Sequence, residues 1–105
     1  MNTYTVKITE SARNDMEKIY NYIALDLFSP LAAMNQYNRI ANAISSLKTM
    51  PERYPLFESK PERLRGIRKL VVDNYIVCYI VDEKEVVIIA IFYGASDVSA
   101  KLQSR

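Results

Sequence analysis

The feature that most constrains the fold of this chain is residues 64–97, where three strand-like runs follow one another with short breaks. The runs cover residues 67–72, 75–81 and 86–93, and each is rich in Val, Ile and Tyr, which favour strands. Asp73-Asn74 separates the first two runs, and both residue types tolerate the left-handed backbone of a two-residue hairpin turn. The segment therefore predicts a three-stranded antiparallel meander.

The first half of the chain changes from strand to helix periodicity. Apolar residues alternate with polar ones over residues 3–8, which predicts a first strand. From about Glu10 to Leu27 they recur every three to four positions, which predicts an amphipathic helix. Ser29-Pro30 then favours a break and a new helix, because serine caps free amides and proline suits a first turn. Since a second apolar stripe runs from there to Leu47, we expect an antiparallel helical hairpin.

The remaining segments complete the expected fold. Pro51, Pro55 and Pro61 predict an irregular connection into the meander, and residues 99–102 a short terminal turn or helix. The order β-α-α-β-β-β indicates an α+β fold: a small antiparallel β-sheet packed on an α-helical hairpin. At 105 residues the chain fits one domain, residues 1–105. We expect the hairpin to cover one sheet face and the other face, or its rim, to serve function.

Composition excludes several kinds of chemistry. The chain has no histidine, which excludes Ser-His-Asp and Cys-His nucleophiles, and only two glycines, which excludes phosphate-binding glycine loops. The one cysteine, Cys78, lies in an apolar strand and is expected to be buried. We expect no metal and no cofactor. Without a membrane-length apolar run or a leader, we expect a cytoplasmic protein with no membrane partner.

Positive charge is concentrated in residues 51–69, although the formal net charge is only +2. Six of the 14 basic residues lie in this segment: Arg53, Lys60, Arg63, Arg65, Arg68 and Lys69. The last five form a candidate surface for phosphates, a nucleic acid or an acidic protein segment. The alternative is that they are ordinary solvated charges. Strand alternation places Arg65 and Lys69 on one face and Arg68 on the other.

Tyr93 is the best functional candidate among the eight tyrosines. It ends the last predicted strand beside Gly94, where its phenol could reach into a cleft. The alternative is ordinary packing at a strand end.

Two long segments resemble the RelE/ParE superfamily of toxins from type II toxin-antitoxin systems. YNYIALDLFSPLAAMNQYNRIANAISSLKTMPERYPL is similar to the helical hairpin and following loop of ParE-like members, and GIRKLVVDNYIVCYIVDEKEVVIIAIFYGASD to the shared meander. The hairpin has the length found in ParE rather than in the shorter RelE ribonucleases. The resemblance covers nearly the whole chain.

The resemblance implies a growth-inhibiting toxin, of a kind associated with plasmid stabilisation, that is neutralised by a cognate antitoxin. The antitoxin tail would wrap the toxin and become ordered on binding. ParE members are associated with inhibition of DNA gyrase by binding. RelE-like members are metal-independent endoribonucleases that cut mRNA on the ribosome. In them, basic residues and a tyrosine position the RNA, activate the ribose 2'-hydroxyl and stabilise the phosphorane.

The nuclease residues carry over to this chain only in part. Arg65, Arg68 and Lys69 match the basic start of the first meander strand, and Tyr93 with Asp97 matches the end of the last.

Three departures count against RNA cleavage. Ile76 stands where nuclease members usually have arginine, residues 94–96 lack the usual basic side chains, and the tail KLQSR has no tyrosine. Members of the ParE branch also often have basic residues in the segment that matches 94–96, so this departure applies to both branches.

Three functional hypotheses follow. The first is a ParE-like toxin that acts by binding, with gyrase as the target that the family implies. The second is a RelE-like ribonuclease with Arg65, Arg68, Lys69 and Tyr93 as catalytic residues and ribosome-bound mRNA as substrate. The third is an attenuated orphan that only binds antitoxin.

Overall fold

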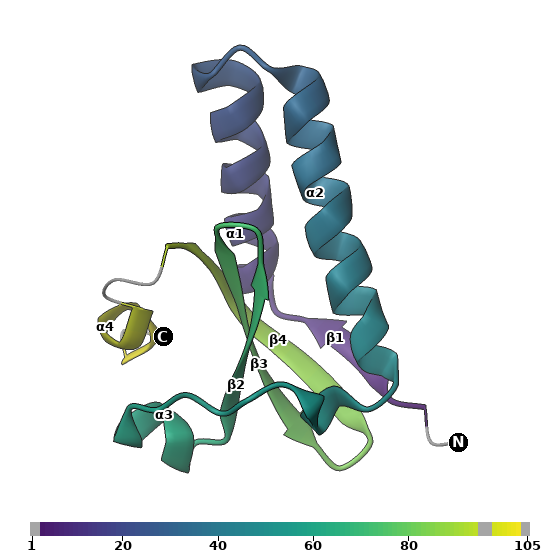
Figure 1. Cartoon of the computed structure of the whole chain (residues 1–105), viewed down its shortest axis with the longest axis vertical. Coiled ribbons are helices and arrows are strands. Elements are labelled where there is room, and N and C mark those ends of the chain that lie inside the picture. The colour runs from purple at the N-terminus through teal and green to yellow at the C-terminus, as the bar shows by residue number, and fades with distance from the viewer. Residues whose placement is uncertain (1–2, 95–97, 104–105) are drawn as a thin grey trace.

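The computed structural model describes residues 3–94 and 98–103 (Figure 1). Along the chain the elements are β1 (Thr5–Ile8), α1 (Glu10–Asn21), the π-helical turn η1 (Tyr22–Asp26), α2 (Pro30–Ser45), the 3₁₀ turns η2 (Ser46–Lys48) and η3 (Pro51–Arg53), α3 (Lys60–Leu64), β2 (Ile67–Val72), β3 (Tyr75–Asp82), β4 (Glu85–Tyr93) and α4 (Val98–Gln103). The predicted α+β fold is confirmed.

The sheet has four strands in the order β1-β4-β3-β2. β2, β3 and β4 form the predicted antiparallel meander. β1, however, pairs parallel to β4, with Thr5 opposite Glu85 and Ile8 opposite Ile88. The sheet is therefore mixed rather than wholly antiparallel as expected. A parallel pair needs a long crossover connection, which the helical hairpin and the first two meander strands supply.

The helices α1 and α2 form the predicted antiparallel hairpin, which extends well beyond the sheet (Figure 1). The Thr9 side chain caps α1 by accepting a hydrogen bond from the Ala12 N–H at 3.1 Å. Ser29 makes no side-chain cap at the start of α2; its carbonyl oxygen instead accepts the Ala33 N–H at 3.0 Å. Pro30 occupies the first turn, where its missing N–H costs no helical hydrogen bond.

Both sheet faces carry a hydrophobic core. The larger core lies between the hairpin and the sheet and includes Met16, Ile40 and Leu70. On the other face, Phe57 and the α4 residues Val98 and Leu102 pack with Ile67, Ile76, Cys78, Ala90 and Phe92. Cys78 is buried, as predicted. The second face, which with its rim was expected to serve function, is therefore partly covered, and the covering includes the predicted terminal helix.

The segment between α2 and β2 is more regular than its prolines predict. It contains the short helix α3, with Pro61 in the first turn. Leu56 forms an isolated bridge with Arg68 at the outer edge of β2. There the Phe57 N–H donates to Ile67 O at 3.0 Å and the Lys69 N–H to Pro55 O at 3.0 Å. The connection is thus attached to the sheet edge.

Candidate functional site

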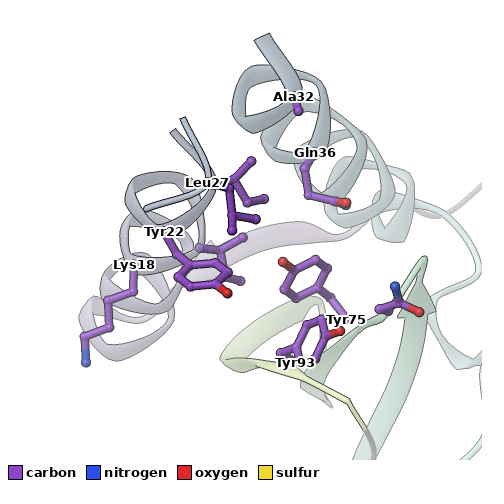
Figure 2. A pocket seen from close by; sticks show the side chains of 10 residues that line it. Lys18, Tyr22, Leu27, Ala32, Gln36, Tyr75 and Tyr93 are labelled. Carbon is purple, nitrogen blue, oxygen red and sulfur yellow. The ribbon is translucent and has the colours of Figure 1, made fainter. Parts of the chain in front are cut away.

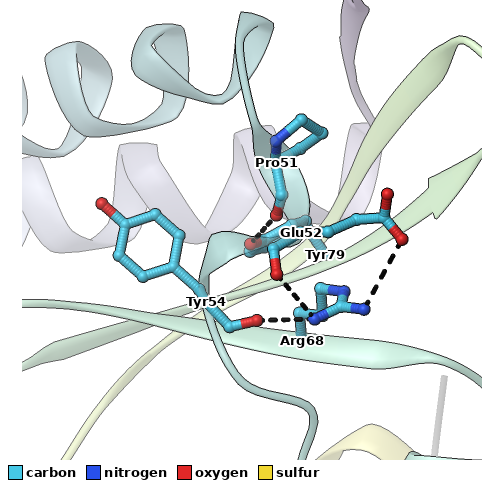
Figure 3. A network of polar contacts seen from close by, with 5 residues as sticks. All are labelled: Pro51, Glu52, Tyr54, Arg68 and Tyr79. Carbon is cyan, nitrogen blue, oxygen red and sulfur yellow. Dashed lines mark hydrogen bonds and ion pairs between the residues drawn. The ribbon is translucent and has the colours of Figure 1, made fainter.

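Arg68 holds the chain segment 51–54 against the sheet (Figure 3). Its Nη1 donates to the carbonyl oxygens of Glu52 at 3.2 Å and Tyr54 at 2.7 Å, and its Nη2 lies 3.8 Å from Glu52 Oε2. The Arg68 side chain is 20% exposed. A guanidinium committed to main-chain oxygens in this way acts as a structural clamp.

Tyr79 completes this clamp from the neighbouring strand. It is the cross-strand partner of Arg68 and is fully buried. Its hydroxyl donates to Pro51 O at 2.6 Å (Figure 3). Burial raises the pKa of Tyr79 to about 12, although the positive charge of Arg68 acts to lower it. The phenol is therefore a fixed neutral donor at neutral pH.

The other predicted basic residues lie apart from Arg68. Lys69 points to the opposite sheet face, where its Nζ lies 5.6 Å from the centre of the Phe57 ring. Lys60 and Arg63 are exposed on α3. Arg65 is exposed at the C-terminal cap of α3 and precedes the strand, so strand alternation does not place it on a sheet face.

Tyr93 lies toward the other end of the sheet. It pairs with Tyr75, whereas Arg68 pairs with Tyr79, four residues further along β3. At roughly 3.3 Å per residue, this offset is about 13 Å. The strand register therefore gives Arg68, Lys69 and Tyr93 no common point of convergence. Their catalytic role stays a prediction, and Asp97 lies outside the described residues.

Ile76 is part of the second hydrophobic core. It is 8% exposed and packs in the cluster that contains Phe92, Val98 and Leu102. The position at which nuclease members usually have arginine is therefore occupied here by an apolar core residue.

A cleft between the hairpin and the sheet brings together residues that the sequence analysis did not connect (Figure 2). It has a volume of about 620 Å³. Its lining consists of Lys18, Ile19, Tyr22, Ile23, Leu27, Ala32, Gln36, Asn74, Tyr75 and Tyr93. An apolar cleft with a few polar groups is the usual form of a binding site.

Three tyrosines shape this cleft. Tyr22 from η1, Tyr75 from β3 and Tyr93 from β4 extend into the same space (Figure 2). The rings of Tyr75 and Tyr93 meet edge to face, with centres 5.4 Å apart, and Tyr93 is 67% exposed. Desolvation raises the pKa of Tyr75, and the neighbouring Tyr93 and Tyr22 add to the effect. The sequence singled out Tyr93 as a candidate but did not indicate that Tyr22 and Tyr75 lie beside it.

A polar tether fixes one wall of the cleft. Asp73 in the β2–β3 turn has a φ of 56°, the left-handed backbone expected there. Its carboxylate accepts a hydrogen bond from Gln36 Nε2 at 2.9 Å and forms an ion pair with Arg39, both on α2. These hydrogen bonds, that of Arg39 first, lower the pKa of Asp73. The turn is thereby attached to α2 beside the cleft residues Asn74 and Tyr75.

Two further properties bear on function. In residues 3–94 and 98–103 no three His, Cys, Asp or Glu side chains are grouped so as to hold a metal ion. None of the helices in this part of the chain has the length and apolar character needed to cross a membrane.

Comparison with solved structures finds the same fold in other proteins. A chain of the chromosomal ParDE system from P. aeruginosa matches with a TM-score of 0.70 and 21% identity, over 90% of this chain and 100% of that one. A chain of the RelBE2 toxin-antitoxin complex from Mycobacterium tuberculosis matches with a TM-score of 0.60 and 22% identity, over 91% and 97%. A conserved hypothetical protein from Helicobacter pylori matches with a TM-score of 0.50 and 12% identity, over 86% and 93%. At these identities the matches establish the fold.

The sequence itself establishes the family. Comparison with curated proteins finds no match. The profile of the ParE toxin of the type II toxin-antitoxin system parDE, however, matches residues 6–98, a span that includes the hairpin, the meander and both walls of the cleft. With the resemblance and the fold in agreement, the chain belongs to the ParE family of type II toxin-antitoxin toxins.

Proposed function

We propose that this chain inhibits growth by binding a protein target of the gyrase type, and that a cognate antitoxin neutralises it. The observation that carries the proposal is the dispersal of the nuclease candidates: Arg68 and Lys69 face opposite sides of the sheet, and Tyr93 is offset along it. Inhibition by binding needs no such set of residues.

The chemistry of RNA cleavage explains why dispersal matters. A base, an acid and a charge-stabilising group must act on one phosphodiester, each within hydrogen-bond reach of its atom. In addition to the backbone offset of about 13 Å, the Arg68 guanidinium is turned to the carbonyl oxygens of Glu52 and Tyr54, whereas Tyr93 lines the cleft. Arg68 would also have to give up its two main-chain carbonyl partners to contact RNA. A binding surface tolerates both features.

The tyrosine-lined cleft is the surface that we assign to the antitoxin. Its apolar wall from Ile19, Ile23 and Leu27 suits apolar side chains of an antitoxin segment that orders on binding. Lys18 supplies a cationic end to the cleft that favours an acidic residue in that segment.

Parallel labelling after induction tests the mode of action. The protein is expressed in a bacterial host without its antitoxin, and incorporation of labelled thymidine and labelled amino acid is followed over minutes. The proposal predicts that DNA synthesis stops first and that co-expression of the antitoxin restores growth. Protein synthesis stopping first, with new mRNA ends on the ribosome, contradicts it. Absence of growth arrest supports the orphan hypothesis.

A double substitution separates the binding and ribonuclease hypotheses. Arg65→Ala with Lys69→Ala removes two nuclease candidates without touching the Arg68 clamp. The proposal predicts full growth arrest by this variant, whereas the ribonuclease hypothesis predicts a large loss. Lys60, Arg63 and Arg65 are exposed on α3 and at its C-terminal cap. This exposed positive charge is the observation that favours the ribonuclease as the second candidate function.

A further inference from the structure

The tip of the helical hairpin carries an apolar surface that is separate from the cleft lining. We call Leu25, Phe28, Leu31 and Met34 the hairpin tip. All four side chains are more than half exposed, and none lines the cleft. They belong to the end of the hairpin that extends beyond the sheet (Figure 1). Single exposed apolar residues are ordinary, whereas a group of large ones indicates an interaction surface.

The backbone at the tip is strained where it presents its most exposed ring. Helix α1 continues into η1, where the Leu27 N–H donates to Tyr22 O at 3.1 Å in the π-helical pattern. Phe28 follows with a left-handed φ of 52° and is 88% exposed. Glycine is the residue that favours this conformation at a helix end, and a bulky side chain is uncommon in it. Within the chain, the Phe28 ring gains little packing in return, so its contact is expected outside the chain.

The charge of the segment indicates the kind of partner. Residues 22–34 contain no lysine or arginine, and Asp26 is their only charged residue. Binding to nucleic acid depends on cations that neutralise phosphates, so a tip without cations does not fit DNA or RNA. An apolar pocket on a protein does fit exposed Leu and Phe side chains.

We propose that the hairpin tip docks into an apolar pocket of the toxin's protein target, while the antitoxin occupies the cleft. This inference rests on the proposed function and divides its two binding events between two surfaces. Leu27 and Tyr22 line the cleft and flank Leu25 in sequence, so the two surfaces adjoin. An antitoxin seated in the cleft would therefore obstruct access of the target to the tip.

Phe28→Gly is the decisive variant, because it removes the exposed ring and relieves the left-handed backbone together. We expect a thermal midpoint equal to or above that of the wild type. We also expect loss of growth arrest and at least a tenfold weaker inhibition of plasmid supercoiling by purified DNA gyrase. Affinity for the cognate antitoxin should stay within twofold. A merely structural role for Phe28 would not combine raised stability with lost toxicity.

Two matched variants test whether the loss of toxicity is specific to the hairpin tip. Leu31→Ser removes a second tip residue and should reproduce the loss of toxicity. Leu64→Ser removes a comparably exposed apolar side chain on α3 and should leave toxicity unchanged. Each variant is compared with the wild type by circular dichroism and by sedimentation velocity of the full chain.

Each contrary outcome overturns a distinct statement. Full growth arrest by Phe28→Gly refutes the tip as the target surface and leaves the proposed function standing. A parallel loss of antitoxin affinity assigns the tip to the antitoxin instead. A wild-type dimer that becomes monomeric on substitution assigns it to a second copy of this chain. Wild-type protein that neither arrests growth nor inhibits gyrase refutes the proposed function itself.

Discussion

Replacing Arg68 by alanine should destabilise this protein rather than remove a catalytic group. The substitution deletes two hydrogen bonds from a charged donor to the carbonyl oxygens of Glu52 and Tyr54, together with a long contact to the Glu52 carboxylate. Buried bonds from charged donors contribute about 1.5–3 kcal/mol each, and the partial exposure of the clamp reduces its whole contribution to about 2 kcal/mol. The exposed Glu52 carboxylate adds little.

Unfolding measurements translate this magnitude into an observable shift. In a domain of this size, ~2 kcal/mol lowers the thermal midpoint by about 10 °C. Urea denaturation followed by circular dichroism gives the free energy of unfolding directly, and toxicity is scored below the variant's midpoint, where the chain is folded. We expect Arg68→Ala to remain toxic there.

Two neighbouring variants serve as controls for this prediction. Lys69→Ala removes the adjacent cation on the opposite face and should cost no more than about 0.5–1 kcal/mol, the value of an exposed cation–π contact. Arg68→Lys should recover only part of the loss, because one ammonium lacks the fork that reaches both carbonyl oxygens. The reasoning is refuted if Arg68→Ala changes the free energy of unfolding by less than about 0.5 kcal/mol yet abolishes toxicity.

Three further predictions concern the polar contacts. Tyr79→Phe should cost about 1–3 kcal/mol at neutral pH by leaving a buried carbonyl unpaired. The folded pKa of Tyr79 is raised from 10 to about 12, so the stability that the wild type gains over Tyr79→Phe should decrease as pH rises from 10 to about 12. Urea titrations in alkaline buffers measure this decrease. Asp15→Ala should cost a similar 1–3 kcal/mol, since its buried carboxylate accepts the Ile91 N–H at 3.0 Å; unchanged unfolding by urea would contradict this. The folded pKa of Asp73 is lowered, so the stability from its contacts with α2 is present above the unfolded value of 3.8 and is lost as pH falls through the folded one. Arg39→Ala should remove the larger part of this acid dependence and leave the part that the Gln36 hydrogen bond supplies, as followed by NMR titration of the Asp73 carboxyl.

Much of the fold could be predicted from local pattern. The meander, the two long helices and the buried Cys78 follow from periodicity and residue type, because backbone hydrogen bonding and the buried face of an element depend on nearby residues. Local pattern was insufficient where proline was concerned, since Pro61 starts a short helix instead of preventing one. It also gave the wrong direction for β1, which pairs parallel to β4, an arrangement that the long connection between the two strands permits.

The candidate site was less predictable, because its residues meet only through packing of distant segments. The sequence by itself singled out the basic segment and Tyr93 as candidates and supported membership in the toxin family. Only the tertiary structure decided that Arg68 clamps main-chain carbonyls and that Tyr22, Tyr75 and Tyr93 share a cleft. Residue type determines what a side chain can bond to, whereas the partner it finds depends on which elements the whole fold brings beside it.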